Sequence, residues 1–305
     1  MIVVPEITIE KIAVAEGHGE SLRDLALRSI KVLLESNSVT DSNGLQTTLI
    51  DSIGGVLVAS FSNERRFPSL AVEIASALGL PPTTPAFDLQ MACSAYPYAV
   101  YLGGRIAADT GKKVLIVDGD VQSRLVDAAD HDTGSIFSDA VTASLVSSGV
   151  SAPSPTRQSY FDFFSKFDSA ALSCSETGPI KMKGFDVFSF VATDVVKFMR
   201  DFLAASGSAQ NLRPSTSDVQ PSTFNLQPFF FVPHQANPYM VRQLAKSLGL
   251  EDRLLTLDES KKNPGSCSIP MTLAAHPECR GHRVLLAGFG AGYSAAAAIV
   301  KYAGI

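Results

Sequence analysis

The segment KKVLIVDGD, residues 112–120, recurs as HRVLLAGFG at residues 282–290, and this pair decides the fold. Each copy contains a short, continuous apolar run, which begins at Val114 in the first copy and at Val284, 170 positions later, in the second. Continuous apolar runs of this length are typical of strands in a sheet that is covered on both faces. One such strand in each half of the chain predicts a duplicated α/β architecture.

Two further landmarks recur at the same spacing. The segment LAVEIASALGL ends at Leu80 and YMVRQLAKSLGL ends at Leu250. Cys93 and Asn263 are also 170 positions apart. Apolar residues at helical spacing predict that the first two segments are amphipathic helices, and Gly79 is placed to end the first of them. A constant offset over three landmarks indicates an internal repeat.

We therefore expect two similar halves, residues 1–150 and 151–305, in an α/β chain whose sheets are enclosed by layers of helix. The Ser/Pro-rich segment SSGVSAPSPTRQ, residues 147–158, is expected to be a connection, and residues 206–223 a surface loop. Neither segment is long enough to separate independent domains.

The composition excludes several classes of protein. The chain has 305 residues, of which 46% are hydrophobic and 18% charged, so it has ample material for a large buried core. Its net charge is -5 and it has no dense Lys/Arg run, which argues against a nucleic-acid partner. No stretch reaches the roughly 18 apolar residues that span a bilayer, and the N-terminus does not resemble a signal peptide. We expect a soluble, cytoplasmic protein with no membrane partner.

The cysteines show no pairing pattern. None of the four belongs to a CxxC motif: Cys93, Cys174, Cys267 and Cys279. This usage fits a reducing compartment. His276 and His282 flank Cys279 with H-x2-C-x2-H spacing, but zinc would require a fourth ligand. We expect a surface loop before a strand there, and no metal site.

Seven motifs together resemble the thiolase superfamily, and within it the beta-ketoacyl-acyl-carrier-protein synthase III branch. In chain order they are RFPSLAVEIASALG, PAFDLQMACSA, VDGDVQSRLVDAADHDT, GFDVF, FFFVPHQAN, NPGSCSIP and GFGAGYSAAA. VPHQAN is the most specific of them, and it stands in the expected order with the cysteine and the asparagine. The likeness extends from about residue 50 to the C-terminus. It implies a thiolase-like fold, with the two halves forming one globular α-β-α-β-α unit.

The resemblance implies a role for each matched position. Cys93 matches the acylated cysteine, His234 the histidine of the PHQAN segment, and Asn263 the asparagine of the third motif. The backbone N–H groups of Cys93 and Ala291 match the donors of the oxyanion hole. The implied reaction is acyl transfer from acyl-CoA or acyl carrier protein to Cys93, followed by decarboxylative condensation with a malonyl thioester, expected to be malonyl carrier protein. No cofactor is expected.

The residue types suit this chemistry. A cysteine attacks a thioester as its thiolate, and a free cysteine has a pKa of about 8.5. Cys93 follows an expected strand and begins an expected helix, which predicts that the helix dipole lowers its pKa. A neutral His234 and the Asn263 amide can hydrogen-bond the thioester oxygen where negative charge develops. Asparagine cannot act as a base, which favours decarboxylation over direct deprotonation.

Each of these residues also has an ordinary interpretation. A lone cysteine is usually a packed thiol, a lone histidine is as often a satisfied core or surface residue, and an asparagine before Pro264 is usually a turn. Their joint placement favours the site. The repeat puts Cys93 and Asn263 at equivalent strand ends, where α/β sheets gather ligands.

Four further positions carry weaker expectations from the resemblance. Phe67 matches a residue that lines the acyl pocket of the partner subunit, and Phe289 one that lies beside the nucleophile, which implies a homodimer. Both are more often plain core residues. Arg242 and Lys246, on the exposed face of one expected helix, could dock the acidic acyl carrier protein.

The chain departs from the family pattern near the site. It has no tryptophan, and His131 replaces the arginine of the segment that holds the adenine of CoA. A carrier-protein-linked primer therefore becomes more attractive than a CoA-linked one. FSDAVTA at residues 137–143, Ala291 and Pro264 replace family residues and suggest altered acyl selectivity. Tyr239 stands where the family often has a docking arginine.

Two alternatives stay open beside a condensing enzyme of fatty acid or specialised polyketide or lipid biosynthesis. An acyltransferase of the same fold would move the acyl group from Cys93 to another acceptor without releasing carbon dioxide. A non-catalytic partner subunit of a ketosynthase heterodimer would usually lack the cysteine or the histidine. Because Cys93, His234 and Asn263 are all present, the last alternative is disfavoured.

Overall fold

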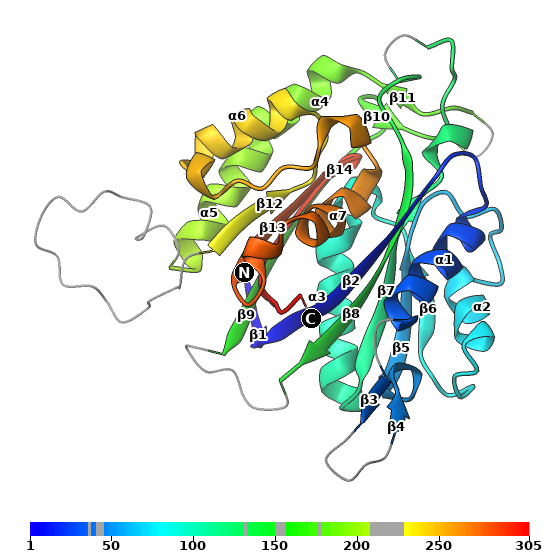
Figure 1. The fold of residues 1–305 in the computed structure, drawn as a ribbon. Helices are drawn as coiled ribbons and strands as arrows, with labels where there is room; N and C mark the ends of the chain where they lie inside the picture. The colour runs from blue at the N-terminus through cyan, green and yellow to red at the C-terminus, as the bar shows by residue number, and fades with distance from the viewer. Residues whose placement is uncertain are drawn as a thin grey trace, which may run out of the picture.

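A computed structural model describes residues 1–35, 38–40, 46–130, 133–149, 157–175, 178–207 and 229–304 (Figure 1). A ten-stranded, curled sheet runs through the described part of the molecule. The sheet has two sections of like topology, joined where β14 and β2 pair in parallel at Lys301 and Thr8. Both sections carry helices on their two faces, as the apolar character of their strands requires.

The first section is built from the N-terminal half. Its strands, in spatial order, are β6 (Ala86–Leu89), β5 (Ile53–Ala59), β7 (Lys113–Asp120), β8 (Asp139–Ser148) and β2 (Ile7–Gly17). Strand β5 is parallel to both β6 and β7. The next two pairings, β7 with β8 and β8 with β2, are antiparallel.

The second section repeats this pattern. Its strands are β12 (Phe229–Pro233), β13 (Arg283–Gly290), β14 (Gly292–Tyr302) and β9 (Gln158–Asp168), with β1 (Ile2–Pro5) added at the edge. β12 and β13 are parallel, whereas β13 with β14 and β14 with β9 are antiparallel. The two predicted strands of the repeat, β7 and β13, occupy corresponding places. The boundary expected at residue 150 lies outside the described residues, and the division into halves stays a prediction.

Two helices form the layer between the sections. α3 (Ala95–Thr110) contacts β5, β7 and β8 on one side and β13 and β14 on the other. α7 (Ser268–Ala275) contacts β2, β8 and β12. Both helices contribute to one buried cluster, which includes Tyr96, Val100 and Ile269. Because α3 is enclosed by both sections, its N-terminus, which follows Cys93, is held from several directions.

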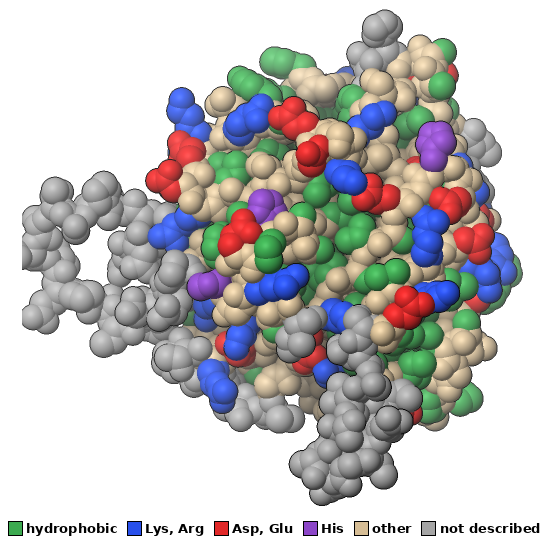
Figure 2. Space-filling model, viewed as in Figure 1, with side chains coloured by type: hydrophobic (Ala, Val, Ile, Leu, Met, Phe, Trp, Pro, Cys, Tyr) green, Lys and Arg blue, Asp and Glu red, His purple; other side chains and the backbone are tan. Residues whose placement is uncertain are grey.

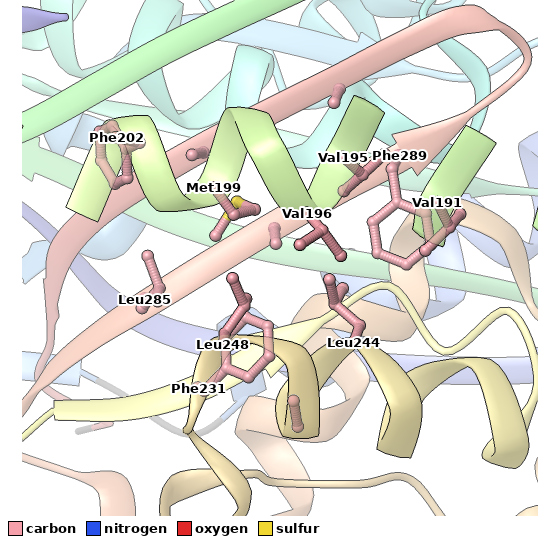
Figure 3. Close-up of a cluster of buried hydrophobic side chains, with 14 of the residues drawn as sticks. Val191, Val195, Val196, Met199, Phe202, Phe231, Leu244, Leu248, Leu285 and Phe289 are labelled. Atoms are coloured by element: carbon pink, nitrogen blue, oxygen red, sulfur yellow. The ribbon is translucent and has the colours of Figure 1, made fainter. Parts of the chain in front are cut away.

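The remaining helices cover the outer faces. α1 (Leu22–Glu35) and α2 (Leu70–Ala77) pack on the first section, at the right of Figure 1. α4 (Gly184–Phe190), α5 (Val196–Ala205) and α6 (Pro238–Leu248) lie at the upper left, over the second section. Figure 3 shows Val196 and Met199 of α5 meeting Leu244 of α6 and Leu285 of β13 in one apolar cluster. The order helix, sheet, helix, sheet, helix confirms the predicted fold class.

The two repeat helices form as the sequence predicts. α2 ends at Ala77 and is followed by Gly79 with a φ of 68°. α6 ends at Leu248, and Gly249 caps it in the left-handed conformation. A residue with a side chain is strained at a positive φ, which explains glycine at both ends.

Short elements complete the described chain. They include the pairs β3 (Ser38–Thr40) with β4 (Gln46–Thr48) and β10 (Leu172–Ser173) with β11 (Lys181–Met182), a π-helical turn at Val191–Val195 between α4 and α5, and several 3-10 turns. On the face shown in Figure 2, cationic and anionic side chains are interspersed. Among the described helices, none combines the length and the apolar character needed to cross a bilayer.

Candidate active site

Cys93 lies at the junction between a strand and a buried helix. β6 ends at Leu89, the single 3-10 turn Ala92–Ser94 carries Cys93, and α3 starts at the next residue. Ala92 adopts a φ of 43°, a conformation uncommon for a residue with a side chain. A Cβ on Gly290 would lie 2.8 Å from the Cys93 Cβ, so glycine is required for the end of β13 to pack against the cysteine.

Two backbone N–H groups converge on the sulfur. The N–H groups of Ala291 and of Cys93 itself lie close enough to the Cys93 thiol to lower its pKa. The Ser294 hydroxyl lies 2.9 Å from the Ala291 carbonyl oxygen and 2.7 Å from the Ser94 hydroxyl, and so ties the residue 291 segment to the start of α3. Fixed N–H donors beside a nucleophile are the feature that stabilises a developing oxyanion. These are the two groups that the resemblance implied.

The thiol does not have the lowered pKa that its position at a helix N-terminus predicts. Burial raises the pKa of Cys93 to about 12, the nearby Asp120 and Asp118 carboxylates raise it as well, and the two N–H groups offset only part of this. Cys93 is 8% exposed, so a thiolate there would have little hydration. The expectation of a lowered Cys93 pKa was wrong because it considered the helix dipole and not the burial of the sulfur. In the resting protein the neutral thiol is the stable form.

Replacing Asp120 with asparagine should therefore speed the alkylation of Cys93 by iodoacetamide. The asparagine Oδ1 can still accept from Ser60 Oγ and from the backbone N–H groups of Phe61 and Ser62, as the Asp120 carboxylate does. Loss of the negative charge lowers the Cys93 pKa and raises the thiolate fraction, so we expect the rate at pH 8 to rise roughly 3- to 10-fold.

The measurement is a pH series of alkylation rates with the exposed Asp127 changed to asparagine as a control. Burial raises the pKa of Asp120 to about 6, so the wild type and the Asp120→Asn variant should converge as the pH falls below that value. An alkylation rate that is unchanged at pH 8 would contradict the assigned effect of the Asp120 charge.

His234 lies at the end of β12, where its backbone N–H donates to the Ala287 carbonyl at 2.8 Å. Its side chain is 2% exposed, and burial lowers the pKa of His234 to about 4. The imidazole is therefore neutral at pH 7. Nδ1 lies 3.0 Å from the Ser268 hydroxyl, which already accepts from the Gln235 N–H at 3.1 Å. Donation by Ser268 to Nδ1 places the imidazole proton on Nε2.

Asn263 has a fixed amide orientation. Its Oδ1 accepts from the Gly265 N–H at 2.9 Å, which leaves the Nδ2 hydrogens as the donors of the side chain. Its backbone N–H donates to the Ile136 carbonyl at 3.0 Å, and its carbonyl accepts from the Ser138 N–H at 3.1 Å. Asn263 is 6% exposed. The side chain is thus presented as a hydrogen-bond donor, which is the role predicted for it.

The fold brings these residues to one region. The turn that carries Cys93 contacts β13 and the 3-10 turn Gly265–Cys267, which directly follows the Asn263 segment. The Gly265 backbone lies beside the His234 imidazole and raises its pKa, against the larger effect of burial. The centroid of the His234 ring is 5.5 Å from that of Phe289, the residue before Gly290, in a T-shaped contact. The strand ends that supply Cys93 and His234 are the carboxyl ends of β6 and β12, as expected for a site on an α/β sheet.

A large cavity opens from Cys93. Its volume is about 1440 Å³, and apolar side chains from distant segments line part of it: Met91, Leu125, Phe137, Leu172, Ile180 and Tyr293. Polar residues line the rest, including Arg65, Arg66 and Lys166. His234 and Asn263 do not line this cavity. The space on this side of Cys93 suits the acyl group that the sulfur would carry.

The weaker expectations have mixed placements. Phe67 is 84% exposed, and Phe289 is 1% exposed within the cluster of Figure 3, where it lies near Val191. Arg242, on α6, is paired with Glu259 at 3.4 Å, and Lys246 lies in the last turn of the same helix. The acyl-pocket role of Phe289 and the docking role of the two cations stay predictions.

The H-x2-C-x2-H segment has other partners in the structure. His276 Nδ1 contacts Glu278 at 2.7 Å and Nε2 contacts the Thr256 carbonyl at 2.9 Å, while Cys279 is fully buried. Among the described residues, no group of three or more His, Cys, Asp or Glu side chains is arranged to hold a metal ion. The departure at His131 lies outside the described residues.

Sequence reasoning missed three buried polar residues beside the site: Asp118, Asp120 and Gln122. All three lie at the end of β7 or just beyond it. A signal was available in DGDVQ, where polar residues alternate at the end of an otherwise apolar run.

Comparisons with known proteins identify the family. Models of 3-oxoacyl-[acyl-carrier-protein] synthase III match residues 87–161 and, for its C-terminal part, residues 228–302. Beta-ketoacyl-[acyl-carrier-protein] synthase III 2 of Deinococcus radiodurans is 32% identical over 273 residues, which cover 83% of this chain and 75% of the relative. The chain belongs to the beta-ketoacyl-acyl-carrier-protein synthase III family. It is thus a condensing enzyme of the acyltransferase class.

Solved structures agree with this assignment at the level of fold. The 3-oxoacyl-(acyl carrier protein) synthase III of Pseudomonas aeruginosa PAO1 has a TM-score of 0.76 at 23% identity, over 100% of the synthase described here and 99% of that chain. The priming beta-ketosynthase of the R1128 polyketide pathway has a TM-score of 0.69 at 19% identity, over 98% and 97%. Both are similar to the synthase over its whole length.

Proposed function

We propose that the synthase transfers an acyl group from a thioester to Cys93 and then condenses it with malonyl carrier protein, releasing carbon dioxide. The observation that carries the proposal is the set of donors around the sulfur. Two backbone N–H groups meet at Cys93, and the neutral His234 and the oriented Asn263 amide lie in the adjoining segments. This arrangement offers a separate group of donors for each half-reaction.

In the first half-reaction the Cys93 sulfur attacks the carbonyl carbon of the acyl thioester. The new carbon–sulfur bond gives a tetrahedral intermediate, its collapse breaks the bond to the donor thiolate, and the thiol proton of Cys93 passes to that leaving group. The N–H groups of Cys93 and Ala291 stabilise the negative oxygen of the tetrahedral intermediate. Because the resting thiol is neutral, proton loss has to accompany the attack.

In the second half-reaction the malonyl thioester loses carbon dioxide. The electron pair of the broken carbon–carbon bond stays with the thioester, which becomes an enolate. The charge on the enolate oxygen is stabilised by Nε2–H of His234 and Nδ2–H of Asn263. The enolate carbon then attacks the acyl carbon on Cys93, a carbon–carbon bond forms, and the Cys93 thiolate leaves and regains a proton. Neither side chain has to accept a proton, which suits a neutral imidazole and an amide.

The test is to incubate the wild-type synthase with a panel of acyl-CoA and acyl-carrier-protein thioesters, and then with malonyl carrier protein. Intact-mass spectrometry should show one acyl group on the protein, and the second step should yield a β-ketoacyl product with one carbon dioxide per turnover. Turnover without carbon dioxide would favour an acyltransferase with another acceptor. No adduct from any donor would favour a non-catalytic partner subunit.

We also propose that the synthase is a homodimer in which Phe67 enters the acyl pocket of the partner subunit. The support is the match of Phe67 to the family position that lines the partner's acyl pocket, and its 84% exposure, which leaves the side chain accessible to a second subunit. Changing Phe67 to alanine should leave the dimer intact but shift the preferred acyl chain toward longer ones. Sedimentation velocity and the donor panel together check this, with the equally exposed Phe185→Ala as a control. A monomeric wild type would refute it.

A further inference from the structure

Three polar side chains at the end of β7 have no part in the proposed reaction: Asp118, Asp120 and Gln122. Asp118 and Asp120 are two residues apart on β7, so they point to the same side of the strand, and Gln122 begins the 3-10 turn that follows. Their exposures are 0%, 1% and 1%. Polar groups this deeply buried are costly unless they serve a contact. All three face the segment that begins at Asn263.

Gln122 holds the backbone of Asn263 directly. Its Nε2 donates to the Asn263 carbonyl at 3.0 Å and to the Ser138 carbonyl at 3.1 Å. One side-chain amide thus uses both hydrogens to join the two segments that meet at the isolated bridge between Phe137 and Asn263. The Asn263 carbonyl belongs to the same residue as the side-chain amide that the second half-reaction requires.

The two aspartates contact the residues that follow. The Ser266 hydroxyl donates to Asp118 Oδ1, while Asp118 Oδ2 and Asp120 Oδ2 are buried without a hydrogen-bond partner. A Cβ on Gly265 would lie 3.5 Å from Asp120 Oδ2 and 3.4 Å from Gln122 Nε2, so this segment passes directly over the polar face of β7. β7 therefore supports the turn that lies beside His234 and donates to the Asn263 amide oxygen.

Acylation of Cys93 depends on other supports. Its two N–H donors come from Cys93 and Ala291, and the 291 segment is tied to α3 through Ser294 and Ser94. Gln122 lines the cavity that opens from Cys93, but both Nε2 hydrogen bonds go to the Asn263 and Ser138 carbonyls and not to either of those segments. The hydrogen bonds that hold the Asn263 backbone are therefore distinct from those that hold the 291 segment.

We propose that Gln122 is a positioning residue for Asn263, and that it controls the condensation step without affecting acyl transfer to Cys93. This inference rests on the proposed function. A displacement of about 1 Å in a catalytic group can cost roughly 10²-fold in rate. Removal of the Gln122 hydrogen bonds frees the Asn263 backbone on one side and permits such a shift.

The test compares the two half-reactions in Gln122→Met, which keeps the length of the side chain and removes its N–H groups. The rate of Cys93 acylation, measured by intact-mass spectrometry after rapid quenching, should stay within about 2-fold of the wild-type rate. The rate of product formation from pre-acylated enzyme should fall roughly 10- to 100-fold. Gln158→Met is the matched control, since the Gln158 amide bonds the Tyr160 hydroxyl far from the site. Gln122→Leu replaces Gln122→Met if the latter does not fold.

A double variant distinguishes positioning from general damage. If Gln122 acts through Asn263, adding Gln122→Met to Asn263→Ala should slow condensation no further than Asn263→Ala alone. Losses that multiply would overturn the proposal, as would equal losses in both half-reactions or an unimpaired single variant. A wild type that catalyses neither half-reaction would overturn the proposed function, and this inference with it. If the wild type catalyses both half-reactions, a failed prediction for the Gln122 variants would overturn the role of Gln122 and leave the proposed function standing.

Discussion

Replacing Cys93 with alanine should abolish acyl-enzyme formation and reduce condensation by at least about 10³-fold, because the variant lacks the sulfur that lies beside the two N–H donors. The decisive reading is intact mass after incubation with the best acyl donor. One acyl group should add to the wild type and none to the variant.

The other cysteines supply the control. Cys174 lines the same cavity and is exposed, so Cys174→Ala should still take up one acyl group. Cys93→Ser should fold like the wild type and acylate far more slowly, since a hydroxyl is a weaker nucleophile than a thiol. An adduct of undiminished yield on Cys93→Ala would show that another residue is the nucleophile, and would refute the assignment.

Replacing His234 or Asn263 with alanine should reduce condensation by roughly 10²- to 10³-fold each, while Cys93 is still acylated. Both side chains are buried donors, one fixed by Ser268 and the other by Gly265, and they are preorganised for an oxygen that becomes negative only in the second half-reaction. Measuring carbon dioxide release from malonyl carrier protein, with the acyl-enzyme formed beforehand, isolates that step.

His276→Ala is the matched control for the histidine. Its imidazole is engaged by Glu278 and by the Thr256 carbonyl, well away from the cysteine, so both half-reactions should proceed at the wild-type rate. If His234→Ala lost acylation and condensation to the same extent, with its melting temperature unchanged, His234 would be required to activate Cys93. The division of labour proposed for the two half-reactions would then be wrong.

The sequence was informative wherever burial follows a short-range pattern. The continuous apolar runs at residues 114–117 and 284–287 predict strands enclosed on both faces, and β7 and β13 occupy matching places in the two sections. Apolar residues at helical spacing followed by glycine predict α2 and α6. Periodicity is set by neighbours within one element, so it is legible before the chain folds.

The sequence was misleading or silent where distant segments meet. A strand followed by a helix correctly placed Cys93 at the start of α3, yet the same reasoning predicted a lowered pKa, and the structure raises it to about 12. The Asp120 charge and the enclosure of the sulfur come from other strands and turns. The sequence DGDVQ, residues 118–122, shows polar residues at alternate positions. It does not show that these side chains support the segment of Asn263, some 140 residues later.

The sequence alone therefore determined the repeat, the layered fold and the residue types available at the site, because each is written in local patterns of apolar, glycine and polar residues. The tertiary structure decided the protonation of Cys93 and His234, the direction of the Asn263 amide and the partners of Gln122. Those properties depend on desolvation and on hydrogen bonds between segments that are far apart in the chain. Such segments come into contact only when the two sections of the sheet pack around α3.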